Sequence, residues 1–259
     1  MGILNVTPDS FSDGGAHFDR SVAVFAALRM HEEGAAIIDV GGESTRPGSD
    51  EVDVQDELER VVPVIESIRK RSAVTISIDT RKARVAEAAL DAGANIINDV
   101  SALRHDARMR PLAAKRGVPV ILMHMRGEPR TMQDNPQYDD VVTDVARELE
   151  TWRDEAVAAG VDPVNVYVDP GIGFGKTFDH NLELLARCDE FTRIAPVVIG
   201  ASRKGFIGHL TGRPSGATRM AGSLAAVAAA HRGGAAIVRV HDVRETVDFL
   251  KVLNAVAAR

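Results

Sequence analysis

The sequence predicts a single α/β domain over residues 1–259, a (β/α)8 TIM barrel. Eight short β-branched runs alternate with eight segments of helical apolar spacing, and no linker rich in Pro or Ser divides the chain. Near-continuous apolar strands joined by helical crossovers are typical of a parallel sheet covered by helices. A closed barrel requires eight such units at about this length. An open, doubly wound sheet also alternates in this way and remains the alternative.

The individual elements follow from local composition and spacing. The strands are runs rich in Val, Ile and Leu, each closed by a polar residue or a glycine. They cover residues 2–6, 36–40, 74–79, 95–99, 118–124, 165–169, 197–200 and 236–240. The helices have apolar residues three and four apart, as in Leu58, Val61, Val62 and Ile65. They cover residues 22–30, 58–65, 84–92, 109–116, 138–159, 181–188, 219–231 and 243–256.

Composition and charge favour a globular intracellular protein. The chain is 45% hydrophobic and has a formal net charge of −6, so it lacks the basic excess that nucleic-acid binding normally needs. Its one cysteine, Cys188, cannot form an internal disulfide. The longest run of small apolar residues, 221–230, is far shorter than a membrane span. We therefore expect a cytoplasmic protein that binds neither nucleic acid nor membrane.

The carboxyl ends of the predicted strands carry the chemistry, because catalytic groups of a barrel lie there and in the loops that follow. Each end has a hydrogen-bonding or charged side chain. These are Asn5, Asp39, Asp79, Asn98 with Asp99, His124, Asp169, Ser202 with Arg203 and Lys204, and Arg239 with His241. Some of them could serve only as N-caps of the next helix, and Asp39 and Asp99 are the strongest candidates for that structural role.

The loops after the seventh and eighth strands predict a phosphate site, as is usual in this fold. They read GASRKGFIG at 200–208 and RVHD at 239–242. Arg203 offers paired donors, Lys204 a point charge and His241 a further donor, which together suit a phosphate or a diphosphate. The alternative is a solvated basic turn without a ligand.

The first two loops, TPDSFSDGG at 7–15 and GGESTRPG at 41–48, are longer than a minimal connection. Long loops in a compact domain are commonly lids or binding loops. Glycines would let them close over a ligand and exclude water. The alternative is a slack surface segment.

The sixth strand leads into VDPGIGFGKT at 168–177. This is not a P-loop, since the pattern G-x-x-x-x-G-K-[ST] needs a glycine where Pro170 stands. We expect Asp169 to point into a pocket, with Gly171, Gly173 and Gly175 letting the backbone approach a flat ligand. A carboxylate there can accept two parallel N–H bonds from an amidine-like edge, such as that of a pterin or a guanine.

Signals for metals and nucleophiles are few. Neither HExxH nor paired CxxC occurs, so zinc is not expected. Magnesium needs only an oxygen ligand or two besides substrate phosphates and waters, and Asn5 could supply one. Cys188 lies in a predicted helix at the wrong end of the barrel for a nucleophile. Ser202 has no His partner nearby in sequence, which disfavours a hydrolase triad.

Seven segments together resemble one known family over nearly the whole chain. They are GILNVTPDSFSDGG at 2–15, DVGGESTRPG at 39–48, SIDT at 77–80, INDV at 97–100, DPGIGFG at 169–175, SRK at 202–204 and RVHDV at 239–243. On these motifs the chain resembles dihydropteroate synthase. The resemblance implies a TIM barrel that condenses 6-hydroxymethyl-7,8-dihydropterin diphosphate with p-aminobenzoate, releasing diphosphate and 7,8-dihydropteroate.

The resemblance also implies roles for residues at matching positions. The implied pterin site contains Asp79, Asn98, Met123, Asp169, Gly173, Phe174, Lys204 and Arg239. The implied diphosphate site contains Arg46, Arg239 and His241, with Ser202 and Arg203 beside them and Mg2+ held at Asn5. The implied p-aminobenzoate site contains Asp9, Phe11, Thr45, Arg46 and Pro47. Asp79, Asp169, Lys204, Arg239 and Asp9 are the expected catalytic residues.

The implied chemistry agrees with these residue types. Loss of diphosphate from the dihydropterin can leave a delocalised cation, which carboxylates at Asp79 and Asp169 would stabilise. Magnesium and the cationic loops would stabilise the departing anion. The aniline nitrogen needs little activation, so no strong general base is required.

Partners and rival functions follow from the same resemblance. Relatives are usually homodimers, and the helix at 219–231 could form the interface or simply pack on the barrel. Sulfonamides are expected as competitors of p-aminobenzoate, although Gly205 stands where relatives often have a Ser near its carboxylate. The rivals are a pterin-dependent methyltransferase and a non-catalytic pterin-binding paralogue.

Overall fold

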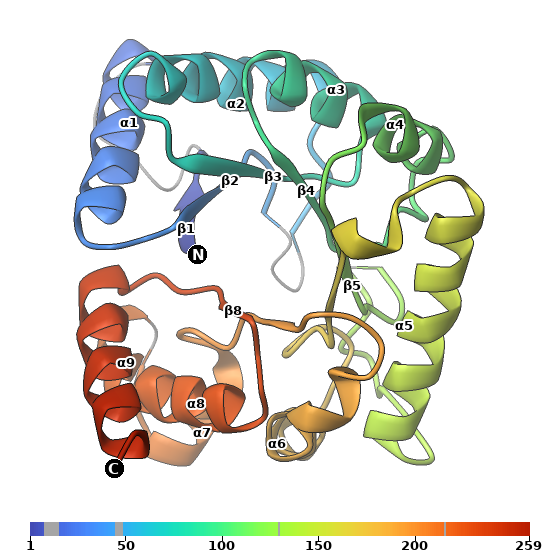
Figure 1. The fold of residues 1–259 in the computed structure, drawn as a ribbon, viewed down its shortest axis with the longest axis vertical. Coiled ribbons are helices and arrows are strands. Elements are labelled where there is room, and N and C mark those ends of the chain that lie inside the picture. The colour runs from blue at the N-terminus through green and yellow to red at the C-terminus, as the bar shows by residue number, and fades with distance from the viewer. Residues whose placement is uncertain (8–15, 45–48, 129, 215) are drawn as a thin grey trace.

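A ring of parallel strands surrounded by helices forms the molecule (Figure 1). The computed structural model describes residues 1–7, 16–44, 49–128, 130–214 and 216–259. In this view the helices follow one another around the outside in chain order (Figure 1). The predicted α/β barrel is therefore confirmed.

All eight predicted strands are present, most of them shorter than expected. They are β1 (Gly2–Asn5), β2 (Ile37–Gly41), β3 (Thr75–Asp79), β4 (Ile96–Asp99), β5 (Val120–Met123), β6 (Val166–Asp169), β7 (Val198–Ile199) and β8 (Ile237–Val238). The first six pair in parallel in chain order, and β7 pairs with β8. Each strand pairs with its neighbour in sequence, which is the order of a barrel wall.

Single bridges join the two sheets at both seams and close the barrel. At one seam Val168 bridges to Val197, and its N–H donates to the carbonyl of Pro196 at 3.1 Å. At the other seam Gly2 bridges to Val240, whose carbonyl accepts from the N–H of Ile3 at 3.0 Å. An open sheet would leave the first and last strands apart, so the doubly wound alternative is excluded.

The eight predicted helices are also present, with ends that differ from the prediction by a few residues, most at the first two helices. They are α1 (Ala16–Glu32), α2 (Val54–Arg69), α3 (Ala83–Asp91), α4 (Met109–Arg116), α5 (Val141–Ala158), α6 (Phe178–Ala186), α8 (Met220–Arg232) and α9 (Val243–Ala257). Local caps fix several ends. Asp53 accepts from the N–H of Gln55 at the start of α2, and Thr177 forms a capping box with His180 at the start of α6.

A further helix, α7 (Gly205–Thr211), follows β7 in a segment that we interpreted as an open loop. The interpretation was wrong because this helix has only seven residues and contains two glycines, so it shows little apolar periodicity. It ends at Gly212, which adopts a left-handed conformation with φ 64°. The cationic segment 202–204 therefore leads directly into a helix.

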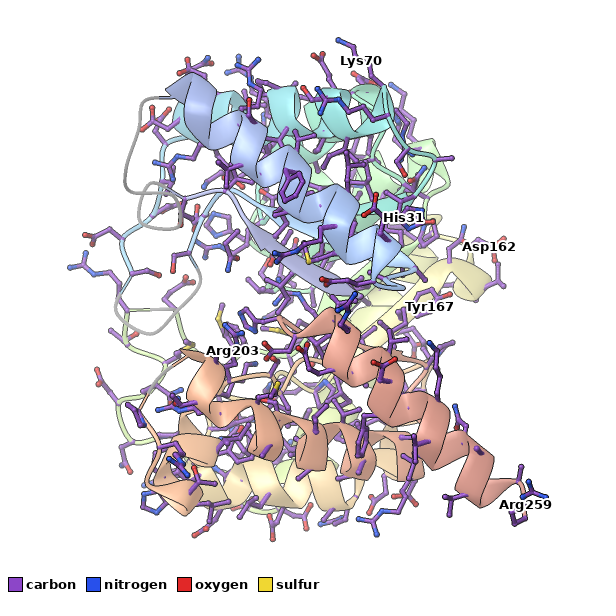
Figure 2. All side chains as sticks on the ribbon, turned by 90° about the vertical axis from the view of Figure 1, so that its left-hand side faces the viewer. His31, Lys70, Asp162, Tyr167, Arg203 and Arg259 are labelled. Atoms are coloured by element: carbon purple, nitrogen blue, oxygen red, sulfur yellow. The ribbon has the colours of Figure 1, made fainter. Side chains whose placement is uncertain are left out.

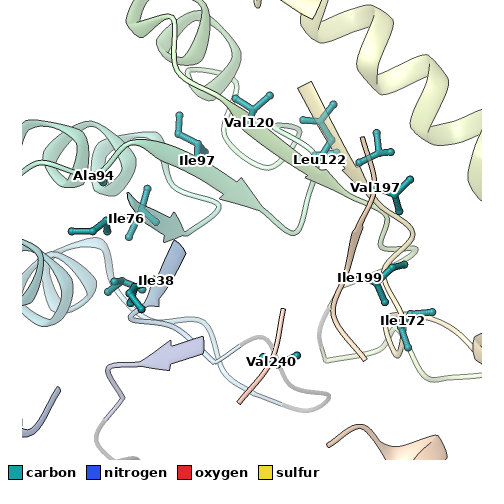
Figure 3. Close-up of a cluster of buried hydrophobic side chains, with 14 of the residues drawn as sticks. Ile38, Ile76, Ala94, Ile97, Val120, Leu122, Ile172, Val197, Ile199 and Val240 are labelled. Carbon is teal, nitrogen blue, oxygen red and sulfur yellow. The ribbon is translucent and has the colours of Figure 1, made fainter. Parts of the chain in front are cut away.

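The hydrophobic core lies between the strands and the helices. Ile38, Ile76, Ile97, Leu122 and Val240 are among the buried side chains that line this layer (Figure 3). Residues next to them in the strands point to the inside of the barrel, because side chains alternate along a strand. Near the amino ends of the strands this interior is filled by a second apolar cluster. It contains Ile96, Ile121 and Val198, with Met1, Ile37, Tyr167 and Ile237 against them.

The two ends of the barrel therefore differ. Arg203, which follows β7, lies toward the opposite end from Tyr167 and Asp162 (Figure 2). Apolar side chains fill the amino end, and the polar strand-end residues gather at the carboxyl end. In the parts of the chain that the structure describes, no helix is long and apolar enough to cross a bilayer.

Candidate active site

Arg239 is at the centre of the carboxyl end of the barrel. Its guanidinium donates through Nε to Oδ2 of Asp39 across 2.6 Å and through Nη2 to Oδ2 of Asp79 across 2.7 Å. Asn98 donates from Nδ2 to the same oxygen of Asp39 at 3.1 Å. The ends of β3, β4 and β8 thus meet with the middle of β2 in one hydrogen-bonded group.

Asp39 does not have the structural role that the sequence suggested. It lies within β2, is fully buried and caps no helix. The alternation of strand side chains points Ile38 and Val40 toward the helices and Asp39 into the barrel. Its Oδ1 has no hydrogen-bond partner among the described residues. Asp99 does serve local structure, since its carboxylate accepts from the N–H groups of Ser101 and Leu103.

Burial dominates the electrostatics of this group. Burial raises the pKa of Asp79 to about 7, while Arg239 opposes the increase and Asp39 adds to it. For Arg239 burial acts to lower the pKa, but the two carboxylates outweigh burial and raise it above its usual value. The guanidinium therefore stays charged, and Asp79 changes its charge close to neutral pH.

Asp169, at the end of β6, faces the same space. Its Oδ1 accepts from the N–H of Gly171 at 2.7 Å, and burial raises the pKa of its carboxyl group while Lys204 opposes that increase. This position is consistent with the predicted pocket residue.

Two of the glycines after Asp169 are required by contacts within the protein. A Cβ at Gly171 would lie 1.9 Å from the carbonyl oxygen of His124, and a Cβ at Gly175 would lie 2.6 Å from that of Arg126. Both residues have positive φ. Packing within the protein therefore suffices to explain glycine at positions 171 and 175, and an approach of their backbone to a flat ligand stays a prediction. A Cβ at Gly173 would lie 3.1 Å from Cδ of Lys204.

Lys204 and Phe174 form one wall of the site. The ammonium group of Lys204 donates to the carbonyl of Ile172 and lies 4.6 Å from the ring centroid of Phe174. Burial lowers the pKa of Lys204 to about 8, while Asp169 opposes the decrease. Behind this wall Phe174 packs against an apolar cluster that contains Met123, with Val100, Met125 and Met132.

Ser202 and His241 meet at the ends of β7 and β8. Oγ of Ser202 lies 3.0 Å from Nδ1 of His241, and it also accepts from the backbone N–H of His241 at 3.2 Å. No His lies near Ser202 in sequence, as noted above, and this partner comes from another strand end 39 residues away.

The side chain of Arg203 contacts Asp242, which follows β8. Its guanidinium forms a two-point ion pair with Asp242, through Nε at 3.0 Å and through Nη2. Its backbone is left-handed with φ 60°, and its N–H donates to Ser223 at 2.9 Å. Two of its guanidinium donor nitrogens are thus used within the protein.

Five predicted residues lie outside the described parts of the chain. They are Asp9, Phe11, Thr45, Arg46 and Pro47. The described base of the second loop is held in place by Glu43, which pairs with Arg81 at 2.9 Å and with Lys82. Burial acts to raise the pKa of Glu43, but Lys82 and Arg81 outweigh burial and lower it.

The chemistry of the donor set fits a weakly held magnesium ion. No cluster of three His, Cys, Asp or Glu residues suited to a metal occurs in the described ranges. Asn5 is half-buried at the end of β1, level with Gly41 at the start of the second loop. One neutral oxygen from the protein suits an ion that takes its other ligands from substrate phosphates and water.

Sequence reasoning missed two buried residues of this region. Asp39 could have been found from its place between two apolar strand residues, which points it into the barrel. Lys176 is buried behind Phe174 and donates to Nδ1 of His124 at 3.0 Å. No sequence pattern indicates the contact between Lys176 and His124, because they are 52 positions apart.

Comparisons with known proteins agree on one family. Residues 1–241 match the model of the pterin binding enzyme family. The chain is 48% identical to the dihydropteroate synthase of Haemophilus influenzae over 99% of this chain and 93% of the relative. It is 49% identical to the dihydropteroate synthase of Escherichia coli over 98% of this chain and 90% of the relative.

Solved structures give the same result. The dihydropteroate synthase of Xanthomonas albilineans with 4-aminobenzoic acid superposes with a TM-score of 0.95 at 49% identity, over 100% of this chain and 93% of that one. The same enzyme with 7,8-dihydropteroate gives 0.90 at 46% identity, over 100% and 93%. The Yersinia pestis enzyme with a sulfonamide drug gives 0.94 at 46% identity, over 100% and 94%.

Proposed function

Because this chain belongs to the dihydropteroate synthase family of pterin-binding enzymes, we propose that the residues around Arg239 carry out that family's reaction. The activity is a transferase reaction of folate biosynthesis. It joins 6-hydroxymethyl-7,8-dihydropterin diphosphate to p-aminobenzoate. The observation that carries our assignment of residues is the meeting of Asp79 and Arg239 at 2.7 Å on the polar end of the barrel.

The pterin ring binds among Asp79, Asn98 and Asp169. The carboxylate of Asp169 accepts N–H bonds from the amidine-like edge of the ring, and Asn98 is oriented by its bond to Asp39. Phe174 and Met123 supply the apolar wall, and Gly173 brings its backbone beside Lys204. This arrangement leaves the ring between two carboxylates.

The bond between the pterin methylene carbon and the diphosphate oxygen breaks first, and its electron pair leaves with the diphosphate. Ionised Asp79 and Asp169 stabilise the positive charge that spreads over the ring. The nitrogen of p-aminobenzoate then attacks the methylene carbon and loses its proton to solvent. No residue is needed as a strong general base.

The leaving diphosphate is bound by Arg239, His241 and Ser202, with Arg203 and Lys204 beside them. Asn5 would hold Mg2+, and the ion would neutralise negative charge on the leaving diphosphate. The first two loops complete the p-aminobenzoate site through Asp9, Phe11, Thr45, Arg46 and Pro47.

Sulfonamides compete for the p-aminobenzoate site, as the complex of the Yersinia pestis relative supports. The side chain that relatives often carry at position 205 is absent here. A Cβ at Gly205 would meet only the ring of Phe178, at the ordinary contact distance of 3.7 Å. The position therefore has room for a side chain, and affinity for the substrate carboxylate depends on Lys204 and on backbone N–H groups.

The chain forms a single domain over residues 1–259 and acts as a homodimer through α8, in the cytoplasm. The Ala-rich sequence of α8 supports this interface, since the distance between packed helices depends on the size of the side chains at the contact. Light scattering on the purified protein measures the dimer, and cell fractionation measures the location.

A coupled assay for diphosphate release tests the function directly. Release should require both substrates and Mg2+, and it should stop when either substrate is omitted. An Asp248→Asn variant, changed at an exposed position of α9, is the matched control and should keep full activity. Pterin binding without diphosphate release would indicate the non-catalytic paralogue, and methyl transfer to a corrinoid would indicate the methyltransferase.

A further inference from the structure

Lys176 is a buried lysine that the proposed reaction does not use. It follows the glycine segment after β6 and is 2% exposed. Its Nζ donates to Nδ1 of His124 at 3.0 Å, to the carbonyl of Phe174 at 2.9 Å and to the carbonyl of His124 at 3.4 Å. Three acceptors surround one ammonium group that has three N–H bonds, so every donor of the charged form is used.

These contacts determine the tautomer of His124. The ring is fully buried and lies against Trp152, with centroids 5.3 Å apart. Because Nδ1 accepts from Lys176, the ring proton lies on Nε2, which donates to Oε2 of Glu148 at 3.1 Å. Glu148 also pairs with Arg126, at the surface end of this chain of contacts. The buried ammonium is thereby connected to a partly exposed carboxylate.

The charges around this pair keep the imidazole neutral. Burial lowers the pKa of His124 to about 3, and Lys176 lowers it further while Glu148 raises it. Burial also lowers the pKa of Lys176, with Asp169 and Glu148 opposing the decrease and Lys204 and Arg126 adding to it. The acceptors, two carbonyls and one imidazole nitrogen, favour the ammonium form, because a neutral amine could satisfy only two of them.

The position of Lys176 connects it to the pterin wall. The carbonyl that it binds belongs to Phe174, and the neighbouring carbonyl of Ile172 accepts from Lys204. His124 follows β5 directly, and its N–H donates to the carbonyl of Asp169 at 2.8 Å. One ammonium group thus joins the segment that carries Phe174 to the strand end beside Asp169.

We propose that Lys176 is a positioning residue for pterin binding, which fixes Phe174 and the backbone of the 170–176 segment against the acceptor nitrogen of His124. This inference rests on the proposed function, because it takes that segment to be a wall of the pterin site. Lys176 itself touches no substrate. The hydrogen-bond partners that the described residues give Lys176 all belong to His124 and Phe174, so we expect its loss to affect diphosphate binding little.

The test compares Lys176→Met with Lys115→Met, an exposed lysine of α4 that serves as the control. Calorimetry measures binding of 6-hydroxymethylpterin and, separately, of diphosphate with Mg2+. Lys176→Met should weaken pterin binding by about tenfold or more and leave diphosphate binding within about twofold. Lys115→Met should change neither. An equal loss of affinity for pterin and for diphosphate, or an unchanged affinity for pterin, would overturn the proposal.

Two variants of His124 separate positioning from general packing. His124→Asn keeps an acceptor near the position of Nδ1, so it should retain most of the pterin affinity. His124→Leu removes the acceptor and should weaken pterin binding about as much as Lys176→Met does. Equal losses in the two His124 variants would show that the acceptor is not what matters.

Nitrogen-15 NMR of the unchanged protein keeps the inference testable even if these variants do not fold. The ring of His124 should be neutral, with its proton on Nε2, from about pH 5 to pH 9. A proton on Nδ1 would overturn the assignment of Lys176 as the donor. If the unchanged protein binds no pterin, the proposed function fails, while the NMR result still decides between the two tautomers.

Discussion

Arg239 donates through Nη2 to Oδ2 of Asp79 across 2.7 Å, which joins the end of the last strand to the end of the third. The same guanidinium holds Asp39 through Nε at 2.6 Å. One cation therefore lies between two buried carboxylates, and its position depends on both. Removing either carboxylate therefore changes both the net charge of the group and the position of Arg239 relative to the other carboxylate.

Ionisation of Asp79 should control the fall in activity on the acid side of the pH profile. Its pKa is raised to about 7, and only the ionised form can stabilise a cation on the pterin ring. The rate should therefore fall by about tenfold for each pH unit below about pH 7. An Asp79→Asn variant should lose about 100-fold or more in kcat/KM, and its residual activity should lack this limb. The measurement is the pH profile of diphosphate release. An unchanged limb in the variant would assign the titration to another group.

The same group makes the free energy of unfolding depend on pH. The folded pKa of about 7 lies above the unfolded value, so the folded chain binds the proton more tightly. The stability from Asp79 is fully present below the unfolded pKa of about 4 and is lost as pH rises through about 7, with an upper bound of roughly 4 kcal/mol. Urea unfolding should show Asp79→Asn losing less stability than the unchanged protein between about pH 5 and pH 8. A parallel loss in both proteins would contradict the assignment.

Asp39→Asn should impair both folding stability and catalysis. The variant keeps an amide oxygen that can accept from Asn98 and Arg239, but it loses the negative charge that faces the buried guanidinium, so unfolding should become easier by about 2–4 kcal/mol. The guanidinium of Arg239, which no longer faces a charge at position 39, should shift toward Asp79. We expect this shift to lower kcat more than it raises KM. Urea unfolding and steady-state kinetics measure the two effects. Asp248→Asn, at an exposed position, is the control. Equal unfolding free energies and equal kinetic constants in the two variants would show that Asp39 does not position Arg239.

Asp169→Asn should weaken pterin binding and leave the fold intact. An amide oxygen can still accept from the N–H of Gly171, so the local turn is kept. The amide presents only one acceptor where the pterin edge offers two donors, so binding should lose about 2–3 kcal/mol. Calorimetry with 6-hydroxymethylpterin measures the loss. Unchanged affinity would remove Asp169 from the pterin site.

Two glycine substitutions should separate folding from binding. Gly171→Ala places a Cβ 1.9 Å from the carbonyl oxygen of His124 at φ 70°, and should destabilise the fold by more than about 3 kcal/mol. Gly173→Ala meets the flexible side chain of Lys204 at 3.1 Å, and should destabilise the fold by only about 1 kcal/mol while displacing Lys204. Thermal unfolding and pterin binding together distinguish the two. Similar melting temperatures for both variants would contradict this reading.

The elements of the fold were predictable because their signals are local. Eight apolar runs and eight periodic segments are visible in the sequence, and the structure places a strand or a helix at each. The helix α7 escaped because a seven-residue helix has fewer than two full turns and two of its residues are glycines. Short elements of this kind are stabilised by their neighbours rather than by their own pattern.

The site was predictable by residue type but not by contact. Asp79, Asn98 and Arg239 could be named from strand ends alone, since parallel strands bring their carboxyl ends together. Their hydrogen bonds could not be named, because these depend on which strands close the barrel. The pairs Ser202 with His241 and His124 with Lys176 are 39 and 52 residues apart and leave no trace in local sequence.

We predict that p-aminobenzoate binds appreciably only after the pterin diphosphate, or after diphosphate with Mg2+. The glycine-rich sequences at 7–15 and 41–48 make a site built from Phe11 and Pro47 expensive to order in the absence of a ligand. Bound diphosphate can offset that entropy through Arg46 and through Mg2+ at Asn5, which shifts the population toward the ordered loops.

Equilibrium binding of labelled p-aminobenzoate, with and without magnesium diphosphate, tests this order. Affinity should rise by about tenfold or more when both ions are present, and a sulfonamide should show the same dependence. Deleting residues 45–47 should abolish the increase and the condensation, while pterin binding persists, because the described pterin residues lie on other strand ends. Asp248→Asn should keep the full increase. Equal affinity for p-aminobenzoate with and without magnesium diphosphate would show a preformed site, since loops that are already ordered gain nothing from the first ligand.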